Sequence, residues 1–369
     1  MKISKVETFI LHVPVTRNKI EDSLHQLTHW GLVGVMLHTD TGLCGYGYTG
    51  THAHLPTDQL ISDCISKTYA PLLLGEVAHD VQRLWAKLCY FPPAQWVGRS
   101  GITRLALSAV DIALWDLKAK AAGLPLWRFL GGDSLKKIEA YNTDGGWLNW
   151  TEEELVADAK RLTDDGYPGV KIKIGSADPN RDLERIAAVR KAIGPRLKLM
   201  VDANGKWDLP TGIQFGRKFK DYDVFWFEEP LWYDDLYGHT TLAQTIDTPI
   251  ALGEQLYTLD DFRNFVSARA VHFVQADAVR LGGVTEWWQV ADLALAHHLP
   301  VAPHIGDMMQ VHLHLAIAHQ ACKLMEYIPW TRDCFVEPAT VKNGAFVAPE
   351  QAGAGTTLRA NALEQYGVR

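Results

Sequence analysis

The sequence reads LKLMVD at 197–202, VFWFE at 224–228 and IALGE at 250–254, and each of these apolar runs ends on a carboxylate. Short runs rich in Val, Ile and aromatic residues are typical of buried β-strands. Helical patterns separate them, and five further strand-like runs complete the series, at 139–142, 169–174, 273–277, 300–304 and 324–327. Eight strand–helix units in succession predict a closed (β/α)8 barrel, with an open doubly wound sheet as the alternative.

The residues before this series have a different character. Strand-like runs at 34–39 and 43–48 flank Gly42, which is a hairpin signal, whereas residues 57–130 follow helical patterns. The run LALSAVDIALWDL (105–117) is apolar on most sides, as expected of a buried helix. The polar stretch 16–29 has no clear periodicity, and we expect it to be a long loop.

These patterns divide the chain into three parts. We expect an N-terminal α+β domain at 1–130 and a barrel domain at 131–330. The tail, 331–369, carries further β-like runs, and we expect it to pack back on the N-terminal domain.

Composition excludes several classes of function. The chain has 369 residues, 47% of them apolar, and a net charge of −7 without a Lys/Arg block, which argues against nucleic-acid or anionic-membrane partners. It contains no apolar run of about 18 residues, so no membrane span is expected. The N-terminus meets charge within seven residues and does not resemble a secretory signal. Five scattered cysteines fit a reduced, cytoplasmic protein.

The carboxylates at the strand ends predict a metal site. Asp202, Glu228 and Glu254 stand 26 residues apart, twice, so at matching ends of neighbouring barrel strands they point into one space. Separate helix caps are the alternative for any single acid. Because buried like charges repel, three of them require a cation, and an all-oxygen ligand set suits Mg²⁺.

Candidate bases lie at the ends of other strands. Lys171 and Lys173 alternate along one strand and therefore face the same side, where two ammonium groups lower each other's pKa. His304 follows the seventh run, and Asp277 on the preceding run is placed to fix its tautomer. Glu229 faces away from the ligands, and we expect it to support the site, for example by holding a lysine. A metal between two bases predicts removal of a proton next to a carboxylate.

These motifs resemble the enolase superfamily, and within it the mandelate racemase subgroup. The resemblance covers nearly the whole chain and rests on these segments: SAVDIALWD (108–116), KIK (171–173), VDAN (201–204), WFEEP (226–230), GE (253–254), Asp277 with Gly282-Gly283, and His304. It implies a (β/α)7β-type TIM barrel with an N-terminal α+β capping domain completed by the C-terminal tail.

The resemblance also implies a role for each residue. It implies Asp202, Glu228 and Glu254 as Mg²⁺ ligands. The other implied roles are a base (Lys173), a residue that tunes this base and touches the substrate carboxylate (Lys171), a second base or acid (the His304–Asp277 pair), a protonated electrophile (Glu326) and a residue that positions the substrate (Asn204).

Closer features are similar to galactarate/talarate-type acid-sugar dehydratases, among them VGRSG (97–101) and QVHLHL (310–315). Such enzymes form a metal-stabilised enediolate and lose the β-hydroxyl to give a 2-keto-3-deoxy sugar acid. A racemase or epimerase of a 2-hydroxy acid and a cycloisomerase of a sugar lactone or anhydro-sugar acid remain alternatives. Ala276, where the family usually has Pro, and residues 305–309 depart from the dehydratase pattern.

Two loops are expected to form the substrate lid. The first contributes Arg17, Lys19 and His25, and the second contributes His52; their polar and cationic groups suit a polyhydroxy acid, although each can also be an ordinary solvated residue. A metal site at His312 and His314 is rejected, because no third ligand is evident. By analogy with barrel enzymes of this group we expect a homo-oligomer.

Overall fold

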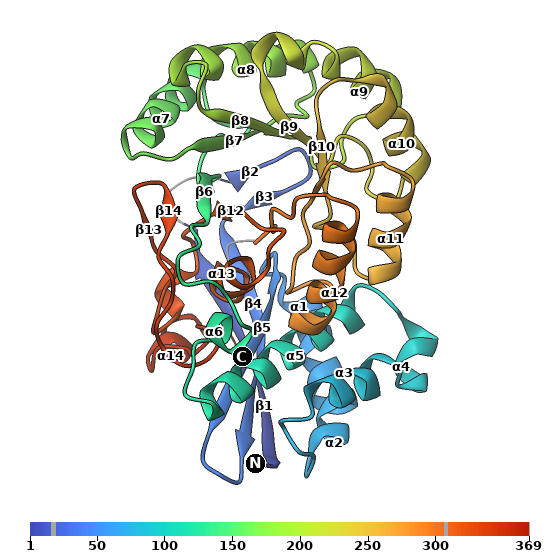
Figure 1. The fold of residues 1–369 in the computed structure, drawn as a ribbon, viewed down its shortest axis with the longest axis vertical. Coiled ribbons are helices and arrows are strands. Elements are labelled where there is room, and N and C mark those ends of the chain that lie inside the picture. The colour runs from blue at the N-terminus through green and yellow to red at the C-terminus, as the bar shows by residue number, and fades with distance from the viewer. Residues whose placement is uncertain (16–19, 306–308, 369) are drawn as a thin grey trace.

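The structure, a computed structural model, describes residues 1–15, 20–305 and 309–368 and has two parts (Figure 1). The N-terminal part, called the cap below, contains a three-stranded antiparallel sheet in the order β1-β4-β5. Its strands are β1 (Ile3–Pro14), β4 (His29–Thr39) and β5 (Cys44–Thr51). The predicted turn at Gly42 is confirmed, because this residue has a φ of 82° between β4 and β5.

Helices cover one face of the cap sheet. The long helix α5 (Ile102–Ala121) packs on β5, and Gly45 and Gly47 allow the close approach. A Cβ at Gly47, for example, would lie 1.9 Å from the carbonyl oxygen of Ala109. The other cap helices are α1 (Leu55–Asp63), a π-helical turn (Cys64–Tyr69), α2 (Ala70–Leu73), α3 (Val81–Cys89) and α4 (Pro92–Val97), and α6 (Leu126–Phe129) leads into the second part.

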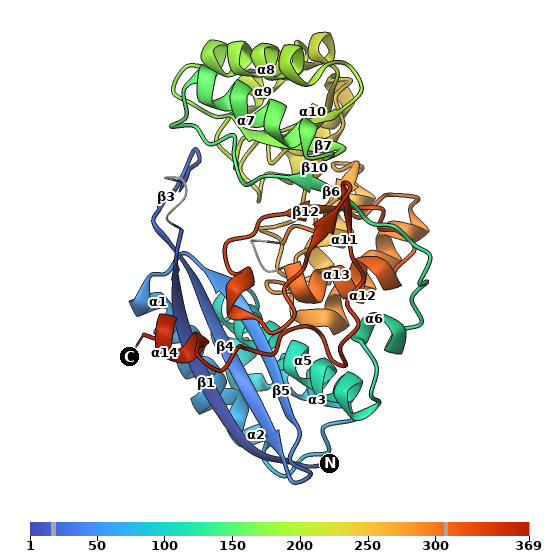
Figure 2. The same cartoon turned by 90° about the vertical axis from the view of Figure 1, so that its left-hand side faces the viewer.

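The first lid segment is not the unstructured loop that the sequence predicts. Within it, β2 (Ile20–Glu21) and β3 (Gln26–Leu27) form a small hairpin that reaches from the cap toward the barrel (Figure 2). The hairpin is attached to the barrel, because the Ser23 hydroxyl donates to the carbonyl oxygen of Ala203 at 2.8 Å and the Leu148 amide donates to that of Glu21 at 2.8 Å. Short strands of this kind escape periodicity analysis.

The second part is the predicted (β/α)7β barrel. Its parallel strands are β6 (Glu139–Asn142), β7 (Gly169–Lys173), β8 (Lys198–Asp202), β9 (Val224–Glu228), β10 (Ile250–Leu252), β11 (Phe273–Val274) and β12 (Leu324–Tyr327). The helices between them are α7 (Glu152–Asp164), α8 (Pro179–Ile193), α9 (Leu209–Gly216), α10 (Leu236–Thr245), α11 (Leu259–Ser267), α12 (Gly283–Ala296) and α13 (Met309–Ala318). A short 3₁₀ helix (Phe219–Tyr222) precedes β9.

The seventh strand is shorter than predicted. Val301 alone bridges Val274 on one side and Cys322 on the other, and pairing of β12 with β6 closes the ring. Pro300 and Pro303 flank this position, and because proline lacks an N–H it cannot donate to a ladder. Ladder pairing in this strand is therefore confined to the hydrogen bonds of Pro300, Val301 and Ala302, and the buried chain continues to His304.

The C-terminal segment contacts both parts of the molecule. Its hairpin, β13 (Val341–Lys342) and β14 (Ala345–Phe346), pairs with β6 of the barrel, and its helix α14 (Ala362–Tyr366) contacts β1 of the cap. A 3₁₀ turn (Arg332–Cys334) lies between β12 and the hairpin. Within the described residues, no helix is both long and apolar enough to cross a membrane.

The cap also holds the loop that follows β11. The buried Asp111 of α5 accepts hydrogen bonds from the amide of Thr285 at 2.9 Å and from its hydroxyl at 2.7 Å. The Ser108 hydroxyl accepts from the Gly282 amide at 2.8 Å, and the Trp85 indole donates to the Gly282 carbonyl at 2.8 Å. Residues 282–285 are thereby fixed five to eight positions after Asp277.

Replacing Asp111 by Ala should destabilise the protein by about 2 kcal/mol, because it leaves two buried donors of Thr285 unpaired. Asp111→Asn keeps one acceptor and should cost less. Urea unfolding followed by tryptophan fluorescence measures both values. Asp63→Ala, which removes an exposed partner of Lys67, is the control and should leave the unfolding midpoint in place. An unchanged midpoint for Asp111→Ala would show that this contact does not hold the two parts together.

Candidate active site and metal centre

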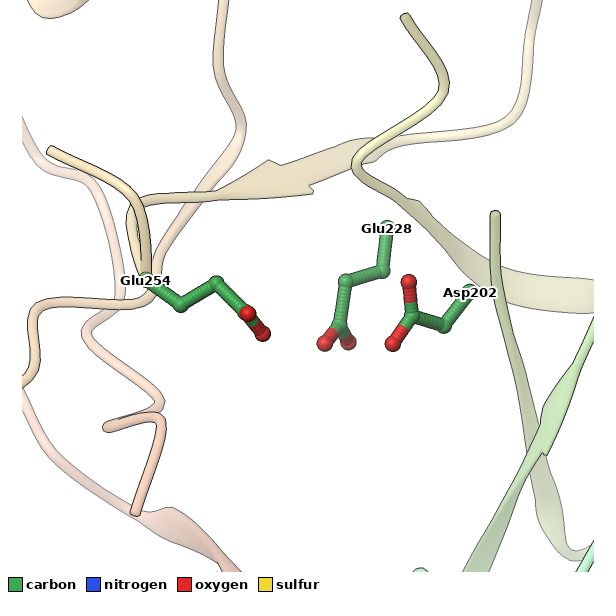
Figure 3. Close-up of side chains that lie close together, drawn as sticks. All are labelled: Asp202, Glu228 and Glu254. Atoms are coloured by element: carbon green, nitrogen blue, oxygen red, sulfur yellow. The ribbon is translucent and has the colours of Figure 1, made fainter. Parts of the chain in front are cut away.

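Three buried carboxylates meet at the carboxyl ends of neighbouring strands. Asp202 and Glu228 are the last residues of β8 and β9, and Glu254 follows β10 after Gly253, whose φ of 146° turns the chain. Each residue offers a ligand oxygen, and these oxygens all lie within 4.8 Å of one another. Figure 3 shows Glu254 pointing toward the other two from the opposite side. The predicted convergence of the three carboxylates is thus confirmed, and three convergent oxygen donors are positioned to bind a hard divalent cation such as Mg²⁺.

Cationic side chains from neighbouring strands contact these carboxylates. Lys171 Nζ lies 2.5 Å from Glu228 Oε1 and 3.6 Å from Asp202 Oδ2, and Lys173 Nζ lies 2.5 Å from Asp202 Oδ2. Even so, burial raises the pKa of Glu228 to about 7, against the opposing effect of Lys171. The site therefore favours additional positive charge.

Both lysines face the same space, but their charge state differs from the expectation. Burial lowers the pKa of Lys173, and Lys171 lowers it further, which is the mutual effect predicted from the sequence. Asp202, with Asp22 and Glu254, outweighs both effects and leaves the pKa of Lys173 above its usual value. The pKa of Lys171 is also raised, because Glu228 and Glu326 overcome its burial.

His304 and Asp277 form the expected pair. His304 Nδ1 lies 2.8 Å from Asp277 Oδ2, and its Nε2 lies 3.0 Å from Glu254 Oε2. Burial lowers the pKa of His304, but Glu254 and the hydrogen bond with Asp277 raise it more, so the net shift is upward. The structure thus places a lysine and a histidine on different sides of one group of carboxylates.

Sequence reasoning missed Arg280. Its guanidinium donates to the Glu254 carbonyl at 3.0 Å and lies 3.4 Å from Glu254 Oε1 and 3.5 Å from Asp277 Oδ2. One side chain therefore joins a metal ligand to the partner of His304. Its position three residues after Asp277, in an otherwise apolar turn, is the signal that could have identified it.

The residues expected near the substrate lie in one cavity of about 60 Å³. Asn204, Glu326, His25 and His52 line it, whereas Arg17 and Lys19 fall outside the described residues. The cavity is lined by residues from both the cap and the barrel: Ile20, Asp22, His25, Leu27, Trp30 and His52 from the cap, and Thr143, Trp147, Lys171, Lys173, Asn204, Glu254, Gln255, Arg280, His304, Glu326, Ile328 and Trp330 from the rest of the chain.

His52, one of the expected lid residues, is less cationic than predicted. Burial lowers the pKa of His52 to about 4, and the nearby His25 adds to this effect, so His52 is neutral at pH 7. The two rings lie 4.3 Å apart. Asp22, which sequence reasoning missed, faces the cavity and lies 3.1 Å from His25 Nδ1. This end of the cavity is polar and carries both hydrogen-bond donors and acceptors.

Two further residues differ from their expected states. Glu326 lies 2.9 Å from Lys171 Nζ, and although burial raises its pKa, this lysine lowers it more, so the carboxyl is ionised rather than protonated. Glu229 is buried near Glu254, which together with burial raises its pKa strongly, and within the described part of the chain it forms no ion pair with a lysine. Asn204 Oδ1 accepts from Lys173 Nζ at 2.9 Å.

Family models match most of the chain. Residues 5–131 match the N-terminal domain of mandelate racemase / muconate lactonizing enzyme, and residues 154–362 match the enolase C-terminal domain-like family.

Individual relatives agree with this result. L-talarate/galactarate dehydratase from Salmonella typhimurium is 35% identical over 94% of this chain and 86% of the relative. 3,6-Anhydro-alpha-L-galactonate cycloisomerase from Streptomyces coelicolor is 32% identical over 99% of both chains. The crystal structure of the Salmonella dehydratase, liganded with Mg and L-lyxarohydroxamate, superposes with a TM-score of 0.92 at 33% identity and covers 100% of this chain and 93% of that one.

Glu228→Gln should weaken Mg²⁺ binding at least about tenfold, because it removes a charged ligand from the centre. Isothermal titration with MgCl₂ measures the affinity directly. Glu286→Gln is the matched control, since Glu286 is also a buried glutamate with a cationic partner, Arg104, but lies outside the centre. Equal affinity in wild type and Glu228→Gln would remove Glu228 from the ligand set.

Proposed function

The chain belongs to the mandelate racemase/muconate lactonizing enzyme family of the enolase superfamily, and from this premise we propose that it is a Mg²⁺-dependent acid-sugar dehydratase. The observation that carries the proposal is the placement of Lys173 and His304 around the carboxylates Asp202, Glu228 and Glu254. A protein that only binds a sugar has no need of two bases at one metal centre. The dehydratase relative at 35% identity supports the choice of reaction.

Asp202, Glu228 and Glu254 would hold Mg²⁺, which when bound would supply positive charge to the substrate carboxylate and make the neighbouring C–H bond more acidic. Lys171 and Asn204 line the same cavity, and we assign them to binding that carboxylate. Both are held in place, since Lys171 is surrounded by carboxylates and the Asn204 amide donates to Asp202 Oδ1 at 2.9 Å.

Lys173 is the proposed base for the α-proton. It must be neutral to accept a proton, and Asp202 is the largest of the charges that hold its pKa high, beside Asp22 and Glu254. Once Asp202 shares its charge with a cation, this raising effect weakens, while burial and Lys171 continue to lower the pKa of Lys173. The lysine then accepts the proton from the α-carbon.

His304 is the proposed acid. Asp277 on one side and Glu254 on the other raise its pKa, which favours the protonated ring before the reaction. The ring gives its proton to the β-hydroxyl, the C–O bond breaks, and water leaves while the α,β double bond forms. The resulting enol ketonises to a 2-keto-3-deoxy sugar acid. Glu326 contacts Lys171, and its proposed place is beside the substrate carboxylate.

A cycloisomerase is the second candidate, because such a relative is 32% identical over 99% of both chains. Lys173 and His304 would play the same parts in a cycloisomerase. There the leaving oxygen belongs to a ring, so the ring opens and the oxygen stays attached to the product. Arg17, Lys19, His25 and His52 are the proposed contacts for the distal hydroxyls in either case.

We further propose a cytoplasmic homo-oligomer with a cap at 1–130, a barrel at 131–330 and a tail at 331–369. Its partner is a small-molecule acid sugar, and we propose neither a nucleic-acid nor a membrane partner. The odd number of scattered cysteines, three of them buried, supports a reducing compartment. Analytical ultracentrifugation measures the oligomeric state.

Incubation with hexarates and hexonates, and in parallel with their lactones and anhydro acids, plus Mg²⁺ should yield a keto product that reacts with semicarbazide. Mass spectrometry then separates the candidates, since dehydration removes one water and ring opening leaves the mass unchanged. Deuterium uptake at the α-carbon without any keto product would favour a racemase or epimerase and exclude dehydration.

Lys173→Ala and His304→Asn should each lower kcat for dehydration by roughly 100- to 10,000-fold, as expected for loss of a general base or acid. They differ in a second measurement: only His304→Asn should still exchange the α-proton with D₂O, followed by NMR. The exposed Lys191→Ala is the control. A near-normal rate in either variant would show that its assigned role is wrong.

A further inference from the structure

The two histidines at 312 and 314 lie on α13 and face different surroundings. Both are fully buried, on the helix that follows the seventh strand. His312 Nε2 lies 3.0 Å from Asp277 Oδ1, and Asp277 in turn contacts His304, which lines the cavity. His314 Nδ1 accepts from the Trp127 amide at 3.1 Å and has no contact with the site among the described interactions. The pair is therefore one site residue and one packing residue.

Asp277 lies between two imidazole rings. His304 meets one carboxylate oxygen, Oδ2, at 2.8 Å, and His312 meets the other, Oδ1, at 3.0 Å. The Val279 amide also donates to Oδ1 at 2.9 Å. A carboxylate held at one oxygen can rotate, whereas one held at both oxygens has a fixed plane. The orientation of His304 thus depends on contacts made on the far side of Asp277.

The Nε2 atom of His312 faces the main chain as well as the carboxylate, because the amide of Ala278 lies 2.9 Å from it. The two contacts exclude each other: an unprotonated Nε2 accepts from the Ala278 amide, whereas a protonated Nε2 donates to Asp277 Oδ1. The protonated form is the one that holds the carboxylate. The contact between His312 and Asp277 matters because the strands that precede Asp277 and His304 are short. β11 ends at Val274, and the seventh strand is the single bridge at Val301.

We propose that His312 is a positioning residue for the reaction: it holds Asp277 so that Oδ2 faces Nδ1 of His304, making a buried His312–Asp277–His304 series. The kinetic part of this inference rests on the proposed function, in which His304 delivers a proton to the leaving group. The proposal does not require His312 to touch substrate.

Nuclear magnetic resonance tests the positioning without any substrate. In the Mg²⁺-loaded protein with nitrogen-15-labelled histidine, the His304 Nδ1 proton should give a downfield resonance from its bond to Asp277. His312→Phe, which keeps a ring but removes both nitrogens, should shift or broaden this resonance. His312→Gln, whose amide reaches the Nε2 position, should restore it. The matched control His314→Gln should leave it unchanged.

Kinetics gives the second readout. His312→Phe should lower kcat for dehydration about tenfold or more, keep KM within about threefold, and keep α-proton exchange by Lys173 near the wild-type rate. His312→Gln should recover most of the loss. If His312→Phe does not fold, His312→Asn, which is too short to reach Asp277, should give the same result.

The two proposals fail in different ways. An unchanged His304 resonance in His312→Phe or His312→Asn overturns the positioning role, whatever the substrate is. Equal losses of kcat in the His312 variants and in His314→Gln also overturn it, because they indicate general damage to α13. A wild type that converts no acid sugar overturns the proposed function, and the resonance still decides the role of His312.

Discussion

Three carboxylates from neighbouring strands share one buried space, and their mutual repulsion constrains everything around them. At about 4 Å and an effective dielectric constant of about 20, each pair of unit charges repels by about 4 kcal/mol. Basic side chains from three directions offset this repulsion: Lys171 and Lys173 from β7, Arg280 from the turn after β11, and His304 after the seventh strand. A divalent cation fits the same need, which is why the metal centre and both proposed bases occupy one place.

The same constraint explains the construction around Asp277. Its carboxylate pairs with both His304 and Arg280. Yet β11, which precedes it, and the seventh strand, which follows it, are the shortest in the barrel ring. Rigidity comes instead from outside the sheet, because the cap helix α5 holds Thr285 and α13 brings His312 against the carboxylate. Positioning of the proposed acid is thus distributed over the cap, the loop after β11 and a barrel helix.

The sequence predicted the barrel well because every strand or helix that buries one face needs a regular spacing of apolar residues, and this spacing can be recognised in the sequence. It also predicted the convergence of Asp202, Glu228 and Glu254, since equal positions at the ends of parallel strands must meet. It failed for the β2–β3 hairpin, whose strands have two residues each and therefore no period. It also missed Asp22 and Arg280, because single charged residues in loops carry no pattern that separates them from solvated ones.

By itself, then, the sequence determined the fold family and which carboxylates, lysines and histidine converge, because these depend on which residue stands at which strand end. The tertiary structure alone decided the charge states: His52 is neutral and Glu326 ionised, contrary to expectation. It alone revealed that His312 reaches Asp277. The physical reason is that a pKa and a side-chain contact depend on every group within a few ångströms, and most of those groups are distant in the chain.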